Sequence, residues 1–283
     1  MQQLLPEKSE YESFIQSYDK DHYQALRINP LKGDAGTLFS HLGCTLTPVP
    51  WCSTGFYYPQ ELHPGKSPYH EAGAYYIQEP SAMAPAAYLD AQPGEKILDL
   101  CAAPGGKSVL AAQLSPQAEI VACDIHPHRT DLIEKYAARM GVKNIKVSLN
   151  DATVFNREFK DAFDCVLCDA PCSGFGVLSS KPDIKLFRKE SDVEELAALQ
   201  SKILGVAAKY VKRGGSLVYS TCTVFKREND DVVNDFLLEN KNFAAEKIDL
   251  PVDTACGMEK FARFFPFRDG FDGFFIARLK RLV

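Results

Sequence analysis

Short apolar runs alternate with longer amphipathic segments from about residue 93 to the end of the chain. The short runs have the length of buried strands, and the longer segments repeat their apolar residues at helical spacing. Because such strands and helices are joined by crossovers, this order predicts a parallel, doubly wound, Rossmann-like α/β sheet. Ligands of such a sheet bind at the carboxyl ends of its strands. We expect strands at 96–101, 119–124, 145–149, 163–169, 216–220, 242–248 and 274–279, and helices at 107–114, 127–140, 190–211 and 228–240.

The first 75 residues break this alternation. They predict a helix at 10–18, a short strand at 26–29 and a stretch rich in Pro, Gly, Tyr and Trp. We therefore expect a small N-terminal α+β extension at residues 1–75, packed on a main domain at 76–283. The chain has 283 residues, 46% of them apolar, which is enough for one large core and one smaller core.

No targeting or membrane segment is evident in the sequence. It contains no run of about 20 apolar residues, which a membrane-spanning helix requires. The N-terminus is polar and acidic and lacks the apolar core of a signal peptide. We therefore expect a cytoplasmic protein with no membrane partner, and a monomer by default.

The nine cysteines are an odd number in a chain that shows no secretion signal, so disulfides are not expected. Cys165 and Cys168 form a C-x-x-C pair, but no second pair stands at zinc spacing. Their run reads as a buried strand, and no metal site is predicted. Five further cysteines have no partner pattern and are expected to serve packing: Cys44, Cys52, Cys101, Cys123 and Cys256.

The formal net charge of −5 does not indicate a nucleic-acid-binding protein. Basic residues nevertheless gather at 181–189, 209–213 and 226–227. A solvated helix face explains most such clusters. The clusters at 181–189 and 226–227 differ because each follows a candidate catalytic cysteine. A basic rim around a site can bind a polyanion despite the net negative charge of the chain.

A glycine-rich turn joins the first expected strand of the main domain to a helix, in Asp99-Leu100-Cys101-Ala102-Ala103-Pro104-Gly105-Gly106-Lys107. Glycine permits positive φ and close approach of a ligand, and the helix N-terminus offers unpaired amides. Asp124 ends the second strand, Asp151 follows the third and Asp169 ends the fourth. The turn is not G-x-G-x-x-G, so an adenosyl ligand is favoured over a dinucleotide, with Asp124 on the ribose and Asp151 near the adenine.

Two cysteines follow neighbouring strands: Cys172 in Asp-Ala-Pro-Cys-Ser-Gly and Cys222 in Tyr-Ser-Thr-Cys-Thr. A thiolate that adds to carbon 6 of cytosine makes carbon 5 nucleophilic toward a methyl sulfonium, which is covalent catalysis. A lysine such as Lys107 would lower the pKa of such a thiol. The alternative is that both cysteines are buried turn residues without a catalytic role. Two such cysteines in turns after neighbouring strands favour the catalytic interpretation.

From Tyr76 onward, the chain resembles the Nop/Sun (Fmu-like) family of S-adenosylmethionine-dependent RNA cytosine-5 methyltransferases, and most of all its bacterial ribosomal RNA members. The resemblance implies that Cys222 attacks carbon 6, that Cys172 assists release, and that Asp169 and Lys107 lie near the target base. DNA cytosine methyltransferases use the Pro-Cys thiol as nucleophile instead. The matching segments are 77–83, 98–107, 169–174, 181–185, 220–223 and 272–275.

The predicted cofactor is S-adenosylmethionine, and its expected contacts lie on the glycine-rich turn and at the strand ends. Phe267 stands where the family often has histidine. Methyltransferases that act on amines typically have an Asp/Asn-Pro-Pro-Tyr/Phe turn after the fourth strand. This chain has Asp-Ala-Pro-Cys there, which argues against an amine substrate. The expected cofactor contacts are Cys101, Ala102, Ala103, Pro104, Gly105, Gly106, Lys107, Asp124, Arg129, Asp151 and Asp169.

The expected partner is RNA, with ribosomal RNA preferred and transfer RNA as the alternative. A non-catalytic RNA-binding assembly protein that keeps the cofactor fold is the third reading. Bacterial relatives often carry an additional RNA-binding domain, and no such domain is recognised in this sequence. The N-terminal region or a partner is therefore expected to recognise the target RNA. Arg27 either contacts a phosphate or caps its own fold. Most of the N-terminal aromatics are expected in the core and one or two on RNA: Trp51, Phe56, Tyr57, Tyr58, Tyr69, Tyr75 and Tyr76.

Overall fold

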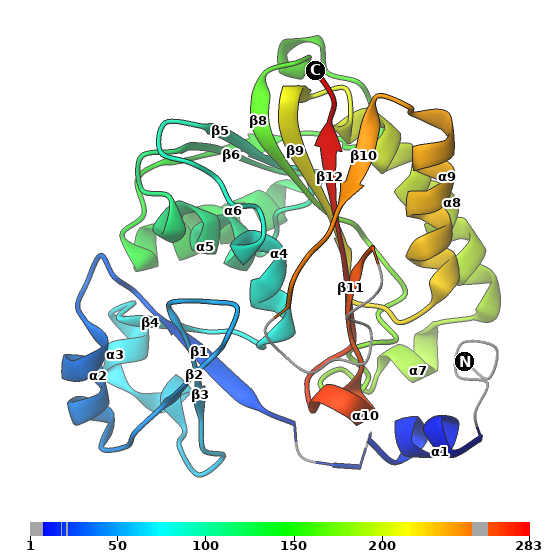
Figure 1. The fold of residues 1–283 in the computed structure, drawn as a ribbon. Helices are drawn as coiled ribbons and strands as arrows, with labels where there is room; N and C mark the ends of the chain where they lie inside the picture. The colour runs from blue at the N-terminus through cyan, green and yellow to red at the C-terminus, as the bar shows by residue number, and fades with distance from the viewer. Residues whose placement is uncertain (1–7, 18, 21, 251–259) are drawn as a thin grey trace.

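The computed structural model describes residues 8–17, 19–20, 22–250 and 260–283. Within these residues the main domain is built on one eight-stranded sheet, which lies between two layers of helices (Figure 1). Its strands are β5 (Lys96–Asp99), β6 (Glu119–Asp124), β7 (Ile145–Leu149), β8 (Phe163–Asp169), β9 (Val211–Thr221), β10 (Phe243–Glu246), β11 (Ala262–Phe264) and β12 (Phe274–Arg281).

The strand order is β10-β12-β9-β8-β5-β6-β7, with β11 paired to β12. The five strands from β9 to β7 are parallel, as the alternating sequence predicts. The expectation of a parallel sheet is wrong for its other end, because β12 runs antiparallel to β9, and β10 and β11 run antiparallel to β12. Between β11 and β12 the structure shows only the four-residue α10 (Pro266–Asp269), which is too short for the crossover that parallel neighbours require.

The two helical layers bury alternate residues of each strand. One layer holds α4 (Ala84–Ala87), α5 (Gly106–Leu114) and α6 (Pro127–Met140), and the other holds α8 (Glu190–Ala207) and α9 (Asp230–Glu239) (Figure 1). Ile97 of β5 packs in the core under the first layer, and its neighbour Leu98 packs in the core under the second. Both cores are continuous, which explains why the strands read as uninterrupted apolar runs.

The helix expected at 190–211 is too long. It ends at Ala207, and Val211 already pairs with Phe163 as the first residue of β9. The Gly-Gly pair expected to close the helix instead forms an irregularity inside β9, where Gly214 has φ +74°. A Cβ on Gly215 would lie 2.6 Å from the carbonyl oxygen of Asp164, so the approach of the two strands requires glycine here.

The N-terminal region forms a second, antiparallel sheet of order β2-β3-β1-β4. The domain boundary expected between residues 75 and 76 falls within β4, and the division into two domains stays a prediction. The elements of this region are α1 (Lys8–Ser17), β1 (Gln24–Ile28), α2 (Ala35–Leu42), β2 (Thr47–Pro48), β3 (Gly55–Tyr58), α3 (Pro68–Glu71) and β4 (Tyr75–Ile77). Two short helices lie in loops of the main domain, α7 (Ile184–Phe187) and α10 (Pro266–Asp269).

A buried arginine joins the N-terminal sheet to helix α5 of the main domain. Arg27 of β1 is fully buried, and its guanidinium donates to the Oε1 of Gln113 at 2.7 Å and to the carbonyl oxygen of Gly106 at 3.0 Å. Both acceptors belong to α5, the helix that follows the glycine-rich turn. Of the two roles left open for Arg27, the structural one is observed, because a fully buried guanidinium does not reach a phosphate in solvent.

The C-x-x-C pair lies on β8, with Cys165 in one core and Cys168 in the other. Residues three apart on a strand point to opposite faces, so these two thiols cannot bind one ion. In the part of the chain that the structure describes, no cluster of three or more histidine, cysteine or acidic residues could hold a metal. The same part contains no helix long and apolar enough to span a membrane. Cys256 lies outside the described residues.

Candidate active site

The two candidate catalytic thiols touch each other. The Sγ atoms of Cys172 and Cys222 lie 3.2 Å apart. They are brought together because β8 and β9 are parallel neighbours in which Asp169 pairs with Ser220, so the loops that follow leave the same sheet edge. Fifty residues of sequence separate the thiols, and only this register places them in contact.

The contact makes the two thiols chemically unequal. The hydrogen bond between the two sulfurs lowers the pKa of Cys222, even though burial and the charge of Asp169 oppose the shift. The charges of Lys107 and Lys181 lower the pKa of Cys222 further. The same hydrogen bond and burial raise the pKa of Cys172 well above its ordinary value. The arrangement therefore favours ionisation of Cys222 over ionisation of Cys172.

A lysine-carboxylate pair lines the same cavity as Cys222. The Nζ of Lys107 is 2.7 Å from Oδ2 of Asp169, whose other oxygen accepts a hydrogen bond of 2.7 Å from the hydroxyl of Ser220. Burial lowers the pKa of Lys107, but the charge and hydrogen bond of Asp169 outweigh it and raise that pKa. Lys107 also lies over the ring of Phe274, with its Nζ 5.2 Å from the centroid. The ammonium group is thus held in one place, with Asp169 fixed at both oxygens.

A buried glutamate organises the two thiol loops. Glu228 accepts hydrogen bonds from the backbone N–H of Ser173 at 2.8 Å and from the amide of Gln200 at 3.0 Å. The hydroxyl of Ser173 donates to the same carboxyl group and lies 2.9 Å from the hydroxyl of Thr223. Sequence reasoning missed this residue, because an acid at the start of an expected helix reads as a partner of the helix dipole.

The glycine-rich turn forms the other side of the same cavity, whose volume is about 490 Å³. The turn contributes residues 101–104 with Gly106 and Lys107, and it faces Asp169 and Cys222. A Cβ on Gly106 would lie 3.2 Å from the hydroxyl of Tyr76, so a larger residue here would require the Tyr76 ring to shift. The structure thus brings the expected cofactor loop and the expected nucleophile into one cavity.

Asp99, the last residue of β5, also lines this cavity and was not among the expected site residues. It is 1% exposed, and burial raises its pKa to about 7 against the hydrogen bond from Ser108. Its Oδ2 accepts that bond at 2.6 Å, whereas Oδ1 has no partner among the described residues. A buried orphan oxygen in a cavity suits a ligand that donates a hydrogen bond. Asp99 ends a strand as Asp124 and Asp169 do, so the same sequence rule could have found it.

The remaining expected cofactor residues lie outside the lining of this cavity, at the ends of β6 and β7, on α6 and in the glycine-rich turn itself. Asp124 ends β6 and is 3.4 Å from the guanidinium of Arg129, which also donates to the carbonyl of Ala103 at 3.2 Å. Asp151 follows β7 and accepts two hydrogen bonds of 2.8 Å from Thr153, which lower its pKa. Gly105 has φ +107°, in the region that favours glycine. Arg129 therefore ties the Asp124 carboxylate to the glycine-rich turn.

The aromatic residues divide between core and cavity walls. Trp51 and Tyr75 are buried, while Tyr76 lines the 490 Å³ cavity. Phe267 packs edge-on against Phe14 with centroids 6.1 Å apart, so this position joins α10 to α1. The remaining expected aromatics, Phe56, Tyr57, Tyr58 and Tyr69, are partly buried.

Two family models match the chain. The one described as 16S rRNA methyltransferase RsmB/F matches residues 86–280, and the one described as the N-terminal domain of 16S rRNA methyltransferase RsmF matches residues 1–80. The ribosomal RNA small subunit methyltransferase F of Erwinia tasmaniensis is 36% identical over 300 residues, covering 100% of this chain and 62% of the relative. That of Escherichia fergusonii is 34% identical over 297 residues, covering 99% and 62%. The chain thus spans about 62% of the length of these relatives.

Solved structures share the fold. The crystal structure of PH0851 superposes with a TM-score of 0.89 at 30% identity, covering 97% of this chain and 63% of that one. A methyltransferase homolog protein from Pyrococcus horikoshii gives 0.79 at 29% identity, covering 95% and 90%. NSun6 from the same organism, solved with SFG, gives 0.84 at 24% identity, covering 98% and 95%. These likenesses confirm the Rossmann-like methyltransferase sheet with its small N-terminal α+β region.

Proposed function

The chain belongs to the RsmB/F family of 16S rRNA methyltransferases, and from that premise we propose that it transfers a methyl group from S-adenosylmethionine to carbon 5 of a cytosine in RNA. Small-subunit ribosomal RNA is the preferred substrate. The observation that carries the proposal is the contact of Cys172 with Cys222 in the wall of the cofactor cavity, which lowers the pKa of Cys222. A thiolate in a cofactor cavity is what addition to a pyrimidine requires.

S-adenosylmethionine, when bound, supplies an electrophilic methyl group. The turn at 101–106 would hold it, with Asp99 accepting a hydrogen bond from its cationic end through the orphan Oδ1. Asp124 and Asp151, at the ends of the next two strands, would take its ribose and adenine. Arg129 keeps Asp124 in place from the other side.

The thiols divide the chemistry of the base between them. The Sγ of Cys222 would add to carbon 6 of the cytosine. The electron pair released to carbon 5 would form the new bond to the methyl group as the sulfonium–methyl bond breaks, which leaves the cofactor as a neutral thioether. Afterwards a base takes the proton of carbon 5, the bond between Sγ and carbon 6 breaks, and the thiolate of Cys222 returns. Once Cys222 is bound to the base, Cys172 loses its acceptor and its sulfur is free to assist this release. Lys107 and Asp169 face the same cavity and hold the base there.

A hollow beside the Cys172 loop carries more basic than acidic side chains and offers a path for the RNA backbone. Its volume is about 670 Å³, and its walls carry Arg188, Lys189, Lys226 and Arg227 together with Glu190, Glu194 and Asp231. Arg188 also donates to the carbonyl oxygen of Cys172 at 3.4 Å, so this charge is tied to the thiol loop. Lysine and arginine side chains that neutralise phosphates supply most of the affinity of such contacts. The target cytosine must leave its stack to reach the thiol.

The test uses the purified chain with tritiated S-adenosylmethionine and, in parallel, 16S rRNA and total transfer RNA. We expect label in 16S rRNA, and bisulfite sequencing should place a protected cytosine at the labelled position. Label in transfer RNA alone would show that transfer RNA, and not 16S rRNA, is the substrate. Label on a different atom or base would overturn the cytosine-5 chemistry. Binding of both RNAs without label would instead indicate a non-catalytic assembly protein.

A further inference from the structure

A second cavity lies against the active site, on its N-terminal side. Its volume is about 390 Å³, within the range of roughly 300–1,000 Å³ that ligand pockets occupy. It shares a wall with the active-site cavity, because five residues line both: Ile77, Gln78, Glu79, Ser180 and Asp272. A molecule bound in one cavity is therefore separated from the other by a single layer of side chains.

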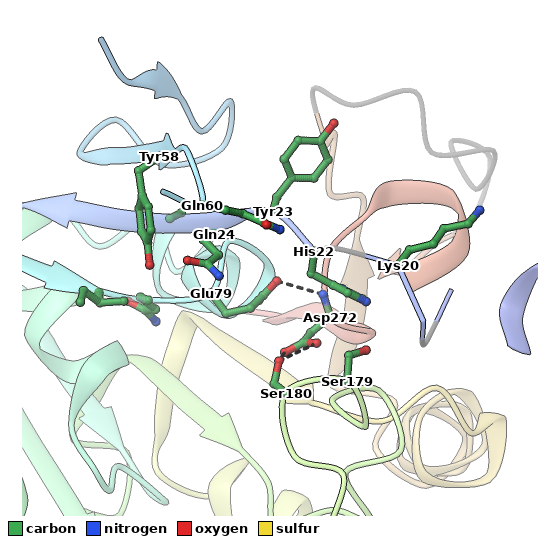
Figure 2. Close-up of a pocket in the computed structure, with 13 residues that line it drawn as sticks. Lys20, His22, Tyr23, Gln24, Tyr58, Gln60, Glu79, Ser179, Ser180 and Asp272 are labelled. Atoms are coloured by element: carbon green, nitrogen blue, oxygen red, sulfur yellow. Dashed lines mark hydrogen bonds between the residues drawn. The ribbon is translucent and has the colours of Figure 1, made fainter. Parts of the chain in front are cut away.

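Hydrogen bonds hold this wall rigid. Glu79 accepts the backbone N–H of Asp272 at 3.0 Å and that of Ala82 at 2.9 Å. The hydroxyl of Ser180 donates to both carboxyl oxygens of Asp272, at 2.9 and 3.1 Å. The wall thus joins the start of the main domain, the loop after Cys172 and the turn before β12. Figure 2 shows these bonds at the base of the cavity.

The other walls present unused polar groups. The amides of Gln24 and Gln60 and the ring of Tyr58 line the cavity, and the two amides make no side-chain hydrogen bond within the described residues. Across from them, the Nδ1 of His22 and the hydroxyl of Ser179 are buried and lack a partner among those residues. Figure 2 shows Gln24 and Tyr58 on one side of Glu79, and His22 and Ser179 on the other.

This combination matches the chemistry of a nucleobase. Each amide offers two donors and one acceptor group, and the edges of bases carry donors and acceptors side by side. A tyrosine ring gives an unstacked base a surface to lie on. Lys20 lines this cavity and Lys181 lines the active-site cavity, so a cation stands on each side of the shared wall for the linking phosphate.

The acids of the wall do not repel that phosphate strongly. Burial, assisted by the neighbouring charge of Asp272, raises the pKa of Glu79 to about 8. Burial also raises the pKa of Asp272, although Ser180, His22 and Lys181 oppose the shift. Burial therefore opposes full negative charge on this pair, while the two N–H bonds to Glu79 act in the other direction.

From the shared wall and the unused polar groups, we infer that this cavity binds the nucleotide next to the target cytosine in the RNA strand. The inference rests on the proposed function and names a specificity subsite for it. Binding there would anchor the strand while the target base enters the active-site cavity. The base in this subsite would be read by the amides of Gln24 and Gln60, and its sugar-phosphate would lie toward Lys20.

The experiment follows from mapping of the methylated cytosine in 16S rRNA. Short RNAs of that sequence are made with an abasic residue on the 5′ side, on the 3′ side or at neither position. The chain should methylate one abasic RNA about tenfold more slowly than the intact RNA, because base hydrogen bonds of this kind are worth about that factor. In a Gln24→Ala/Gln60→Ala variant, the rate on the intact RNA divided by the rate on that abasic RNA should fall toward one.

Two further variants keep the result interpretable. Ser179→Ala removes an unpartnered hydroxyl and should lower the same ratio to a smaller extent. Gln117→Ala is the matched control, because Gln117 is an exposed glutamine before β6, at the opposite edge of the sheet. It should keep the full tenfold ratio.

Several outcomes overturn the inference. Equal rates on all three RNAs would remove the subsite and leave the methyltransferase function intact. A tenfold ratio that persists in the Gln24→Ala/Gln60→Ala variant would place the neighbouring base elsewhere. Absence of methylation on 16S rRNA and on transfer RNA would overturn both the subsite and the proposed function.

Discussion

The sulfur of Cys172 lies 3.2 Å from the sulfur of Cys222, and this contact lowers the pKa of Cys222 and raises that of Cys172. Two cysteines that only lined one cavity would be interchangeable. The hydrogen bond between them removes that symmetry, because it stabilises the thiolate of Cys222 and the thiol of Cys172. Lys107 and Lys181 add positive charge on the Cys222 side. The assignment of nucleophile and release group, which the sequence supports only by resemblance, therefore acquires a physical reason.

Replacement of the nucleophile should separate binding from chemistry. Cys222→Ala is expected to lower methyl transfer to 16S rRNA by at least about a thousandfold, because the covalent step is lost. Its affinity for S-adenosylmethionine, measured by equilibrium dialysis, should stay within about twofold, since the glycine-rich turn is untouched. Cys44→Ala, in the N-terminal region, is the control and should retain activity. Normal turnover by Cys222→Ala would exclude it as the nucleophile.

Replacement of the release thiol should trap the intermediate. In Cys172→Ala, Cys222 can still add to the base, but its departure lacks the assisting sulfur. We expect a protein–RNA adduct that runs as a slow band on a denaturing gel and requires S-adenosylmethionine. The double variant Cys172→Ala/Cys222→Ala should show no band. A Cys172→Ala variant that turns over without adduct would remove the release role.

The ionisation of Cys222 should depend on its neighbour. Because its pKa is lowered by the S–H of Cys172, the thiolate is present at pH values where an ordinary cysteine is protonated. The pH dependence of iodoacetamide labelling, followed by mass spectrometry at Cys222, should have its midpoint below that of a free thiol. Cys172→Ala removes the donor and should move the midpoint to higher pH, whereas Cys172→Ser keeps an O–H donor and should move it less. An unchanged midpoint in Cys172→Ala would contradict the proton assignment.

The fold follows from sequence wherever local periodicity and tertiary pairing agree. The strands expected at 119–124, 145–149 and 163–169 and the helix at 127–140 have the bounds that the structure shows. Disagreement begins at Gly214 and Gly215, because a Gly-Gly pair reads as a helix stop, yet here it accommodates a close strand approach. The antiparallel direction of β12 was also missed, since strand direction depends on connections that propensity does not encode.

The site follows from sequence only as far as motifs reach. The Pro-Cys and Thr-Cys turns identify Cys172 and Cys222, but their contact depends on the register of β8 and β9. Asp99 was available to the same rule that found Asp124. Glu228 was not, because its role arises from three donors that come from two separate segments of the chain. Such residues become visible only when burial and hydrogen bonding are known.

Glu228 gives the last prediction. Removal of its carboxyl group in Glu228→Ala would leave the N–H and hydroxyl of Ser173 and the amide of Gln200 without their buried acceptor. We expect the free energy of unfolding, measured in urea, to fall by about 2–4 kcal/mol, and methyl transfer to fall because Ser173 links both thiol loops. Glu228→Gln keeps one acceptor and should lose less. Glu194→Ala, which breaks only the exposed pair with Arg227, should cost about 0–1 kcal/mol. An equal cost for Glu228→Ala and Glu194→Ala would show that the buried network does not support the thiol loops.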